Sequence, residues 1–185
     1  MSDVDVKIVE IANRLGIADP DWLTRLIALE SGFNPLAKNP YSSARGLIQI
    51  IDSTARDIFG FPDSLSLISK YPDFDSQMDN VVFPYLRKYA PFPTKQSLYM
   101  AVFFPVARFV APDTTFDALF EQKRIGGDKW QQRLAEFHAA NGDIKTVQDY
   151  IDKVEGRAAL IVGGGLAALL AIAALAWVIL RGGFR

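Results

Sequence analysis

The chain has 185 residues, with 20 Lys and Arg against 21 Asp and Glu and a formal net charge of −1. It contains no Cys and a single His, His138. This excludes disulfides, thiolate zinc sites and cysteine nucleophiles, and it argues against a histidine metal cluster or a Ser-His-Asp triad. The balanced charge does not indicate nucleic-acid binding, which favours a basic surface. We therefore expect no metal, no cofactor and no nucleic-acid partner, and a chemistry carried by carboxylates.

Hydrophobic periodicity and turn residues predict a series of short helices. The expected helices cover residues 6–15, 20–31, 53–59, 62–69, 75–89, 94–104, 114–120, 129–140 and 146–154. Gly16 and Gly32 follow the first two, and Asp19 with Pro20 opens the second, as is typical of helix ends. Pro84 is expected to kink the fifth helix. No stretch alternates apolar and polar residues over the length of a strand, so the predicted fold class is all-α.

An apolar segment follows these helices. Every residue from 158 to 180 is apolar or Gly, between Arg157 and Arg181. A helix of this length rises about 35 Å, enough to cross a hydrocarbon core of about 30 Å. The N-terminal helix is charged and lacks the apolar centre of a signal peptide, so we expect a single anchor. The predicted organisation is a helical domain at 1–155, one transmembrane helix at 156–180, and a short basic tail at 181–185.

Glu30 is the first candidate for catalysis. On a helical wheel of the 20–31 helix it falls in the middle of the apolar arc, between Leu23 and Leu26. A carboxylate in that position is either buried or faces a cleft, and burial raises its pKa. A carboxyl group of raised pKa is suited to act as a general acid near neutral pH. The alternative is a helix-terminal residue that bonds locally with the following loop.

Two sequence motifs and a third, weaker one later in the chain resemble those of a known enzyme family. Residues 30–37 read ESGFNPLA, residues 43–50 read SARGLIQI, and Thr-Ala follows at 54–55. This order and spacing resemble the catalytic domain of lytic transglycosylases, the soluble-lytic-transglycosylase-like family with a lysozyme-type fold. The stretch from Tyr150 to Val154 is similar to a late motif of the same family. The resemblance implies a lysozyme-like domain that covers roughly residues 5–155.

The resemblance also implies an activity and a set of site residues. Members cleave the β-1,4 bond between N-acetylmuramic acid and N-acetylglucosamine in peptidoglycan, and leave 1,6-anhydromuramic ends without consuming water. Glu30 would be the single catalytic acid and then the base. Ser43 and Gln49 would bond to the sugar or its N-acetyl group, Gly46 would allow close approach of the chain, and Tyr150 would bind substrate. No cofactor is implied.

Two departures from the family pattern stand out. Asp52 occupies a place near which the family often has Pro. It is expected either to cap the 53–59 helix or to assist a water molecule as a second acid, as proposed for the related goose-type lysozymes. The family's Ala-Tyr-Asn-x-Gly motif is absent, and Val102 and Phe103 stand in place of its Tyr and Asn. Such apolar versions resemble phage-encoded members.

These features predict a membrane-anchored lytic transglycosylase whose substrate is the peptidoglycan glycan strand. The bilayer would be contacted through residues 158–180, in a virion membrane or a host inner membrane. A single-pass virion component that opens the wall during phage genome entry is the leading setting, with other virion or membrane proteins as partners. A part in a secretion machine comes next. The remaining alternatives are a hydrolytic muramidase used for lysis and a non-catalytic peptidoglycan-binding virion protein.

Overall fold

The computed structural model describes residues 2–162, with side chains described up to Gly156. Over this part of the chain the regular structure is helical, and pairing between extended segments is limited to isolated bridges. The helices are α1 (Asp3–Leu15), α2 (Pro20–Ser31), α3 (Asp52–Phe59), α4 (Ser64–Lys70), α5 (Phe74–Gln77), the π-helix η1 (Met78–Val82), α6 (Phe83–Arg87), α7 (Lys95–Phe103), the 3₁₀ helix η2 (Pro105–Ala107), α8 (Phe116–Lys123), the 3₁₀ helix η3 (Gly127–Lys129), α9 (Trp130–Asn141) and α10 (Val147–Val162). The all-α prediction agrees with this architecture.

The ends of the first two helices follow from local sequence. At the start of α1, the Ser2 side chain accepts from Asp5 N and the Asp5 side chain accepts from Ser2 N. Gly16 ends that helix in the left-handed conformation, with φ of 67°. Pro20 opens α2 after Asp19, whose side chain accepts from the backbone of Asp21. These boundaries confirm the predicted ends of α2 and the predicted stop of α1.

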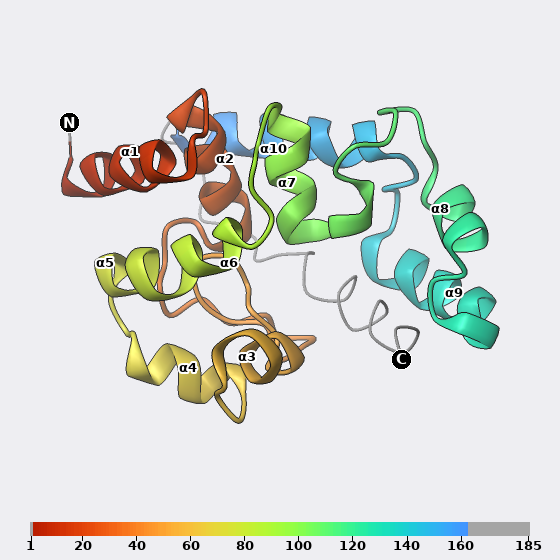
Figure 1. Ribbon diagram of the computed structural model, residues 1–185, viewed down its shortest axis with the longest axis horizontal. Coiled ribbons are helices and arrows are strands. Elements are labelled where there is room, and N and C mark those ends of the chain that lie inside the picture. The colour runs from red at the N-terminus through yellow and green to blue at the C-terminus, as the bar shows by residue number, and fades with distance from the viewer. Residues whose placement is uncertain (1, 163–185) are drawn as a thin grey trace.

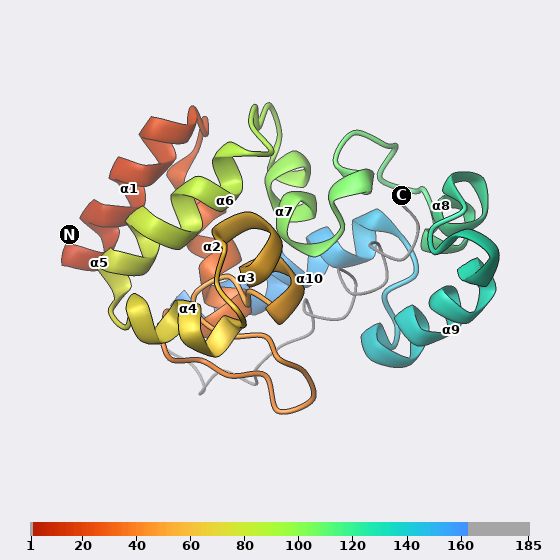
Figure 2. The ribbon, with the colours of Figure 1, turned by 60° about the horizontal axis from the view of Figure 1, so that its bottom comes forward.

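Helix α10 brings the end of the described chain back to its beginning. It packs along α2 and also contacts α7, while α1 packs against α2 and α6. The pair α3 and α4 lies at one edge, and α8 and α9 lie at the end of the molecule remote from α1 (Figures 1 and 2). Residues more than 100 positions apart in sequence therefore meet at the α2–α10 contact.

An aromatic cluster joins α10 and α7 to α8 and α9. Its members are fully or almost fully buried: Phe103, Phe104, Phe116, Phe120, Phe137 and Tyr150. Ring centroids of neighbouring pairs lie 3.9 to 6.0 Å apart, in stacked, tilted and edge-on arrangements. Such pairs contribute about 0.5–1.5 kcal/mol each beyond their burial. The cluster fixes the position of α10 relative to α7, with Tyr150 of α10 stacked on Phe103 of α7.

The predicted continuous helix at 75–89 is wrong in one respect. The segment is divided into α5, the π-helix η1 and α6, and the irregularity lies before Pro84 rather than at it. Phe83 N donates to Met78 O, five residues earlier, as in a π turn. Proline has no N–H and its ring clashes with the carbonyl four residues before it, so the turn before Pro84 widens to accommodate both effects.

The start of α3 also corrects a prediction. The helix begins at Asp52 itself, and Ile51 in the cap position makes no side-chain bond. The expected cap role of Asp52 is therefore wrong. The Asp52 carboxylate instead accepts hydrogen bonds from Ser64 at the start of α4.

The predicted membrane helix falls largely outside the described residues. Helix α10 extends from the predicted 146–154 helix through Val162, into the start of the apolar segment. Within residues 2–162, no helix has both the length and the apolar character needed to cross a bilayer. The stretch 163–180, the tail at 181–185 and their role in the predicted anchor lie outside the described residues.

Candidate active site

Glu30 lies in the last turn of α2, buried in the interior. Its side chain is 1% exposed, and Leu23, Leu26 and Ile27 of the same helix are fully buried around the same face. Of the two positions that the helical wheel left open, buried or facing a cleft, the structure shows the buried one. Gly32 ends the helix two residues later in the left-handed conformation, so the chain turns away directly after the carboxylate.

Burial sets the acidity of Glu30. Desolvation raises its pKa from the ordinary value of 4.5 to about 7, against smaller opposing effects of a hydrogen bond from Tyr150 and the charge of Lys153. The Tyr150 hydroxyl donates to Glu30 Oε1 over 2.9 Å. Glu30 Oε2 has no hydrogen-bond partner among the described residues. One carboxyl oxygen is thus held in place, and the other is buried without a hydrogen-bond partner among the described residues.

Tyr150 is positioned by an aromatic ring of α7. Its own ring stacks on Phe103, with centroids 3.9 Å apart and planes at 8°. Burial and the neighbouring Glu30 carboxylate raise the pKa of Tyr150 well above its usual range, so its hydroxyl keeps its proton and remains a donor. Phe103 thereby acts on Glu30 through Tyr150, a connection from α7 through α10 to α2.

The loop from Ser31 to α3 carries three of the predicted binding residues. Gln49 is 5% exposed and has a φ of 50°, unusual for a residue with a side chain. Its Nε2 donates to Gly46 O over 2.9 Å, whereas its Oε1 has no partner among the described residues. An isolated antiparallel β-bridge joins the backbones of Arg45 and Ile50 across the same turn. The turn therefore presents a buried amide oxygen without a partner.

Ser43 and Asp52 are hydrogen-bonded to each other and to Ser64. Asp52 N donates to Ser43 Oγ over 3.2 Å, and Asp52 Oδ1 accepts from both N and Oγ of Ser64, at 3.0 and 2.8 Å. Ser64 Oγ also lies 2.5 Å from Ser43 O. The carboxylate expected as a possible second acid is thus bonded to Ser64 and helps to join α3 to α4.

Gly46 is required by the protein's own packing. Its φ is 80°, and a Cβ at this position would lie 2.6 Å from Ile68 Cδ1 and 2.7 Å from Gln77 Oε1. The groups that approach Gly46 closely are therefore the side chains of Ile68 and Gln77. The glycan contact expected at Gly46 stays a prediction.

Sequence reasoning missed the role of Phe103. It was noted only as an apolar replacement for a polar family residue, and its stacking partner lies 47 positions later in the chain. The one available signal was the aromatic residue at a helix end in place of the motif's Asn. His138 pairs with Asp117 over 3.0 Å between α9 and α8. Among the side chains the structure describes, no group of three or more His, Asp or Glu could hold a metal ion.

Residues 9–64 match the family model described as "Transglycosylase SLT domain". This family comprises peptidoglycan lytic transglycosylases, so the segment defines a glycan-cleaving enzyme whose substrate is peptidoglycan. The match contains Glu30 and the loop with Ser43, Gly46 and Gln49, and ends before Tyr150. A search of the curated proteins found no match.

Proposed function

We propose that Glu30 performs both proton transfers of a non-hydrolytic cleavage between N-acetylmuramic acid and N-acetylglucosamine. Its carboxyl proton passes to the glycosidic oxygen as the C1–O4 bond breaks. The resulting carboxylate then takes the proton of the muramic 6-hydroxyl, whose oxygen bonds to C1. The products are a free 4-hydroxyl and a 1,6-anhydro ring, and Glu30 is again protonated.

The environment of Glu30 is the observation that carries this proposal. With a pKa of about 7, the side chain is partly protonated at neutral pH and can give and regain a proton without a large free-energy cost. Tyr150 holds Oε1, which leaves Oε2 to carry the proton. The usual glycosidase needs two carboxylates, because water or the enzyme supplies the nucleophile. Here the nucleophile belongs to the substrate, and Asp52 stays bonded to Ser64.

Gln49 and Ser43 are proposed to bind the sugar next to Glu30, together with Gly46 and Tyr150. The buried Oε1 of Gln49, which has no partner within the described part of the chain, supports this, because a buried amide oxygen gains free energy from a donor such as an N-acetyl N–H or a sugar hydroxyl. The Ser43 hydroxyl, which accepts from Asp52 N, retains its own proton for donation. Tyr150 is proposed to act first by orienting Glu30.

We further propose that residues 158–180 anchor the enzyme in a bilayer, and that it serves in a phage virion to open the wall locally. The apolar sequence of the segment supports the anchor. Tyr150 and the first residues of this segment lie on the same helix, α10. Along the helix axis, Tyr150 and Val162 are about 18 Å apart. An anchored enzyme would then cleave strands close to the membrane surface. Carbonate extraction of membranes tests the anchor, and peptide mass spectrometry of purified virions tests the setting.

The reaction is tested by mass spectrometry of purified peptidoglycan digested with the full chain. Muropeptides with 1,6-anhydromuramic ends, lighter by one water than hydrolytic products, are expected. Reducing ends as the main product would overturn the transglycosylase reaction and identify a hydrolytic muramidase. Binding of peptidoglycan without any new ends would identify a non-catalytic wall-binding protein.

A further inference from the structure

Gln77, the last residue of α5, joins two parts of the loop between α2 and α3. It is fully buried. Its Oε1 accepts from Leu47 N over 3.0 Å, and its Nε2 donates to Pro35 O over 2.7 Å. Pro35 follows Glu30 by five residues, and Leu47 precedes Gln49 by two. One amide therefore connects the loop that leaves the catalytic helix with the turn that carries Gln49.

The contact between Gln77 and this turn is close. A Cβ on Gly46 would come within 2.7 Å of Gln77 Oε1, so the Gly46 backbone lies directly against the amide. Gln49 in turn bonds to Gly46 O through both its backbone N, at 3.3 Å, and its side chain Nε2, at 2.9 Å. A shift of the Gly46–Leu47 peptide would therefore move Gln49 with it.

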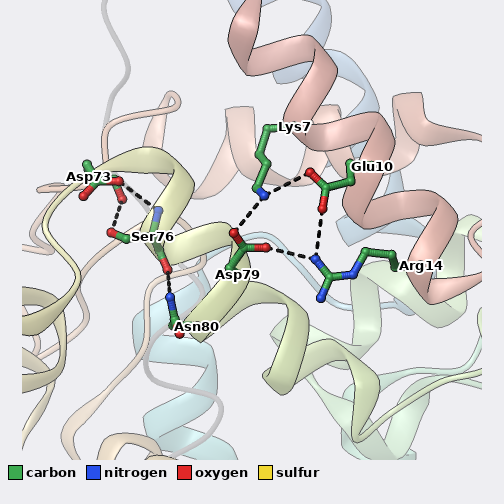
Figure 3. Close-up of polar contacts among 7 residues, drawn as sticks. All are labelled: Lys7, Glu10, Arg14, Asp73, Ser76, Asp79 and Asn80. Carbon is green, nitrogen blue, oxygen red and sulfur yellow. Dashed lines mark hydrogen bonds and ion pairs between the residues drawn. The ribbon is translucent and has the colours of Figure 1, made fainter.

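The backbone after Gln77 is fixed by ion pairs with α1. Asp79 in the π-helix η1 lies 2.8 Å from Lys7 Nζ and 2.9 Å from Arg14 Nη1, and Figure 3 shows both bases converging on it. Each exposed pair contributes about 1 kcal/mol or less, but their common target is a single turn. The π-helix η1, which begins directly after Gln77, is thus attached to α1, and α1 also packs against α2.

The backbone before Gln77 is fixed by a cap. Asp73 Oδ1 accepts from Ser76 N over 2.8 Å, and Ser76 O accepts from Asn80 Nδ2 over 2.9 Å (Figure 3). Gln77 therefore projects from a turn that is held on both sides. This matters because an amide can position a loop only if its own backbone is fixed.

We propose that Gln77 is a positioning residue for glycan binding, which rests on the proposed function of the site. It sets where the Gln49 turn lies relative to the loop after Glu30. Without the amide, Leu47 N and Pro35 O are left without partners in the interior, and the turn moves to satisfy them. Because Gln77 acts through a binding residue and not through Glu30, its loss raises KM more than it lowers kcat.

The test compares Gln77→Met with Gln96→Met in the full chain. Gln96 is the matched control because its Nε2 also bonds to backbone carbonyls that follow α7, at 2.8 Å to Val110 O and 3.2 Å to Ala107 O at the end of η2. Cleavage of soluble, uncrosslinked glycan strands is expected to show KM raised about tenfold for Gln77→Met, with kcat changed less. Hydrogen exchange of the Leu47 amide is expected to accelerate in this variant alone.

The conservative variant Gln77→Glu separates positioning from folding. At about pH 5 a buried Glu is protonated, so it accepts from Leu47 N and donates to Pro35 O as Gln does. It is expected to restore both KM and the slow exchange of Leu47. An unchanged KM and unchanged Leu47 exchange in Gln77→Met, or an equal rise in KM for Gln96→Met, would overturn the proposal. Absence of cleavage by the wild-type chain would instead overturn the proposed function, while Leu47 exchange still tests the link.

Discussion

Two regions border Glu30, and they are built in different ways. The loop between α2 and α3 is held by hydrogen bonds, most of which go to its own backbone and to side chains from α4 and α5. Helix α7 is apolar, and it reaches the site through the ring of Phe103 stacked on Tyr150. The first region contains the amide oxygen of Gln49, which has no partner among the described residues, while the second orients a hydroxyl group. Hydrogen bonding thus places the binding residue, and aromatic packing places the donor to the acid.

The largest effect is expected at the residue the two regions share. Glu30→Gln should lower cleavage of peptidoglycan by about 10³-fold, because Gln keeps the shape and the bond from Tyr150 but has no acidic proton. Release of soluble muropeptides measures the loss. Circular dichroism and thermal unfolding serve as controls for the fold. A parallel loss of helix signal would contradict the catalytic assignment.

The free energy of unfolding should depend on pH through the raised pKa of Glu30. Its pKa is about 7 when folded against an ordinary 4.5, so the folded chain binds this proton more tightly. The resulting stabilisation is complete below the unfolded pKa and is lost as pH rises through the folded pKa. The shift corresponds to about 3 kcal/mol.

Denaturant unfolding of wild type and Glu30→Gln measures this effect. Between about pH 4 and about pH 9, the free energy of unfolding of wild type should fall by about 3 kcal/mol more than that of the variant. Parallel pH profiles for the two proteins would show that Glu30 titrates with an ordinary pKa.

The stacked pair allows the hydroxyl and the ring to be tested separately. Tyr150→Phe keeps the stack on Phe103 and removes the bond that lowers the pKa of Glu30. Cleavage is expected to fall about tenfold, and the alkaline limb of the pH–rate profile should move to higher pH as the pKa of Glu30 rises.

Phe103→Leu is the matched change on the apolar side. It keeps the Tyr150 hydroxyl and should lower the free energy of unfolding by about 1–2 kcal/mol. Cleavage should fall less than in Tyr150→Phe when both are assayed well below their melting temperatures. A larger fall in Phe103→Leu would show that the ring contributes more than position.

The smallest effect is expected at Asp52, on the polar side. Asp52→Asn keeps an Oδ1 acceptor for Ser64, so cleavage should change by about threefold or less and the products should stay anhydro. Product analysis by mass spectrometry decides this. A large loss together with reducing ends in the wild-type digest would restore Asp52 as a second acid.

The sequence by itself determined the features whose causes are local. The caps and the left-handed Gly residues that bound α1 and α2 act within a few positions, and the apolar arc of α2 was enough to place Glu30 on the inward face of its helix. The motif around Glu30 and Gln49 could be read for the same reason, since its residues lie within one short segment. The proposed membrane helix rests on sequence alone.

Only the tertiary structure decided which distant groups meet. Tyr150 reaches Glu30 across 120 positions because α10 packs on α2, and Phe103 reaches Tyr150 because α7 packs beside both. The same holds for Gln77, whose amide meets Leu47 only after a π-helix, unforeseen in the sequence pattern, sets its place against the loop. Hydrophobic burial is non-directional, so the apolar pattern of each helix states that it packs but not against which partner or in which register. The relative placement of the helices is fixed by their combined side-chain packing, and with it the geometry of the site.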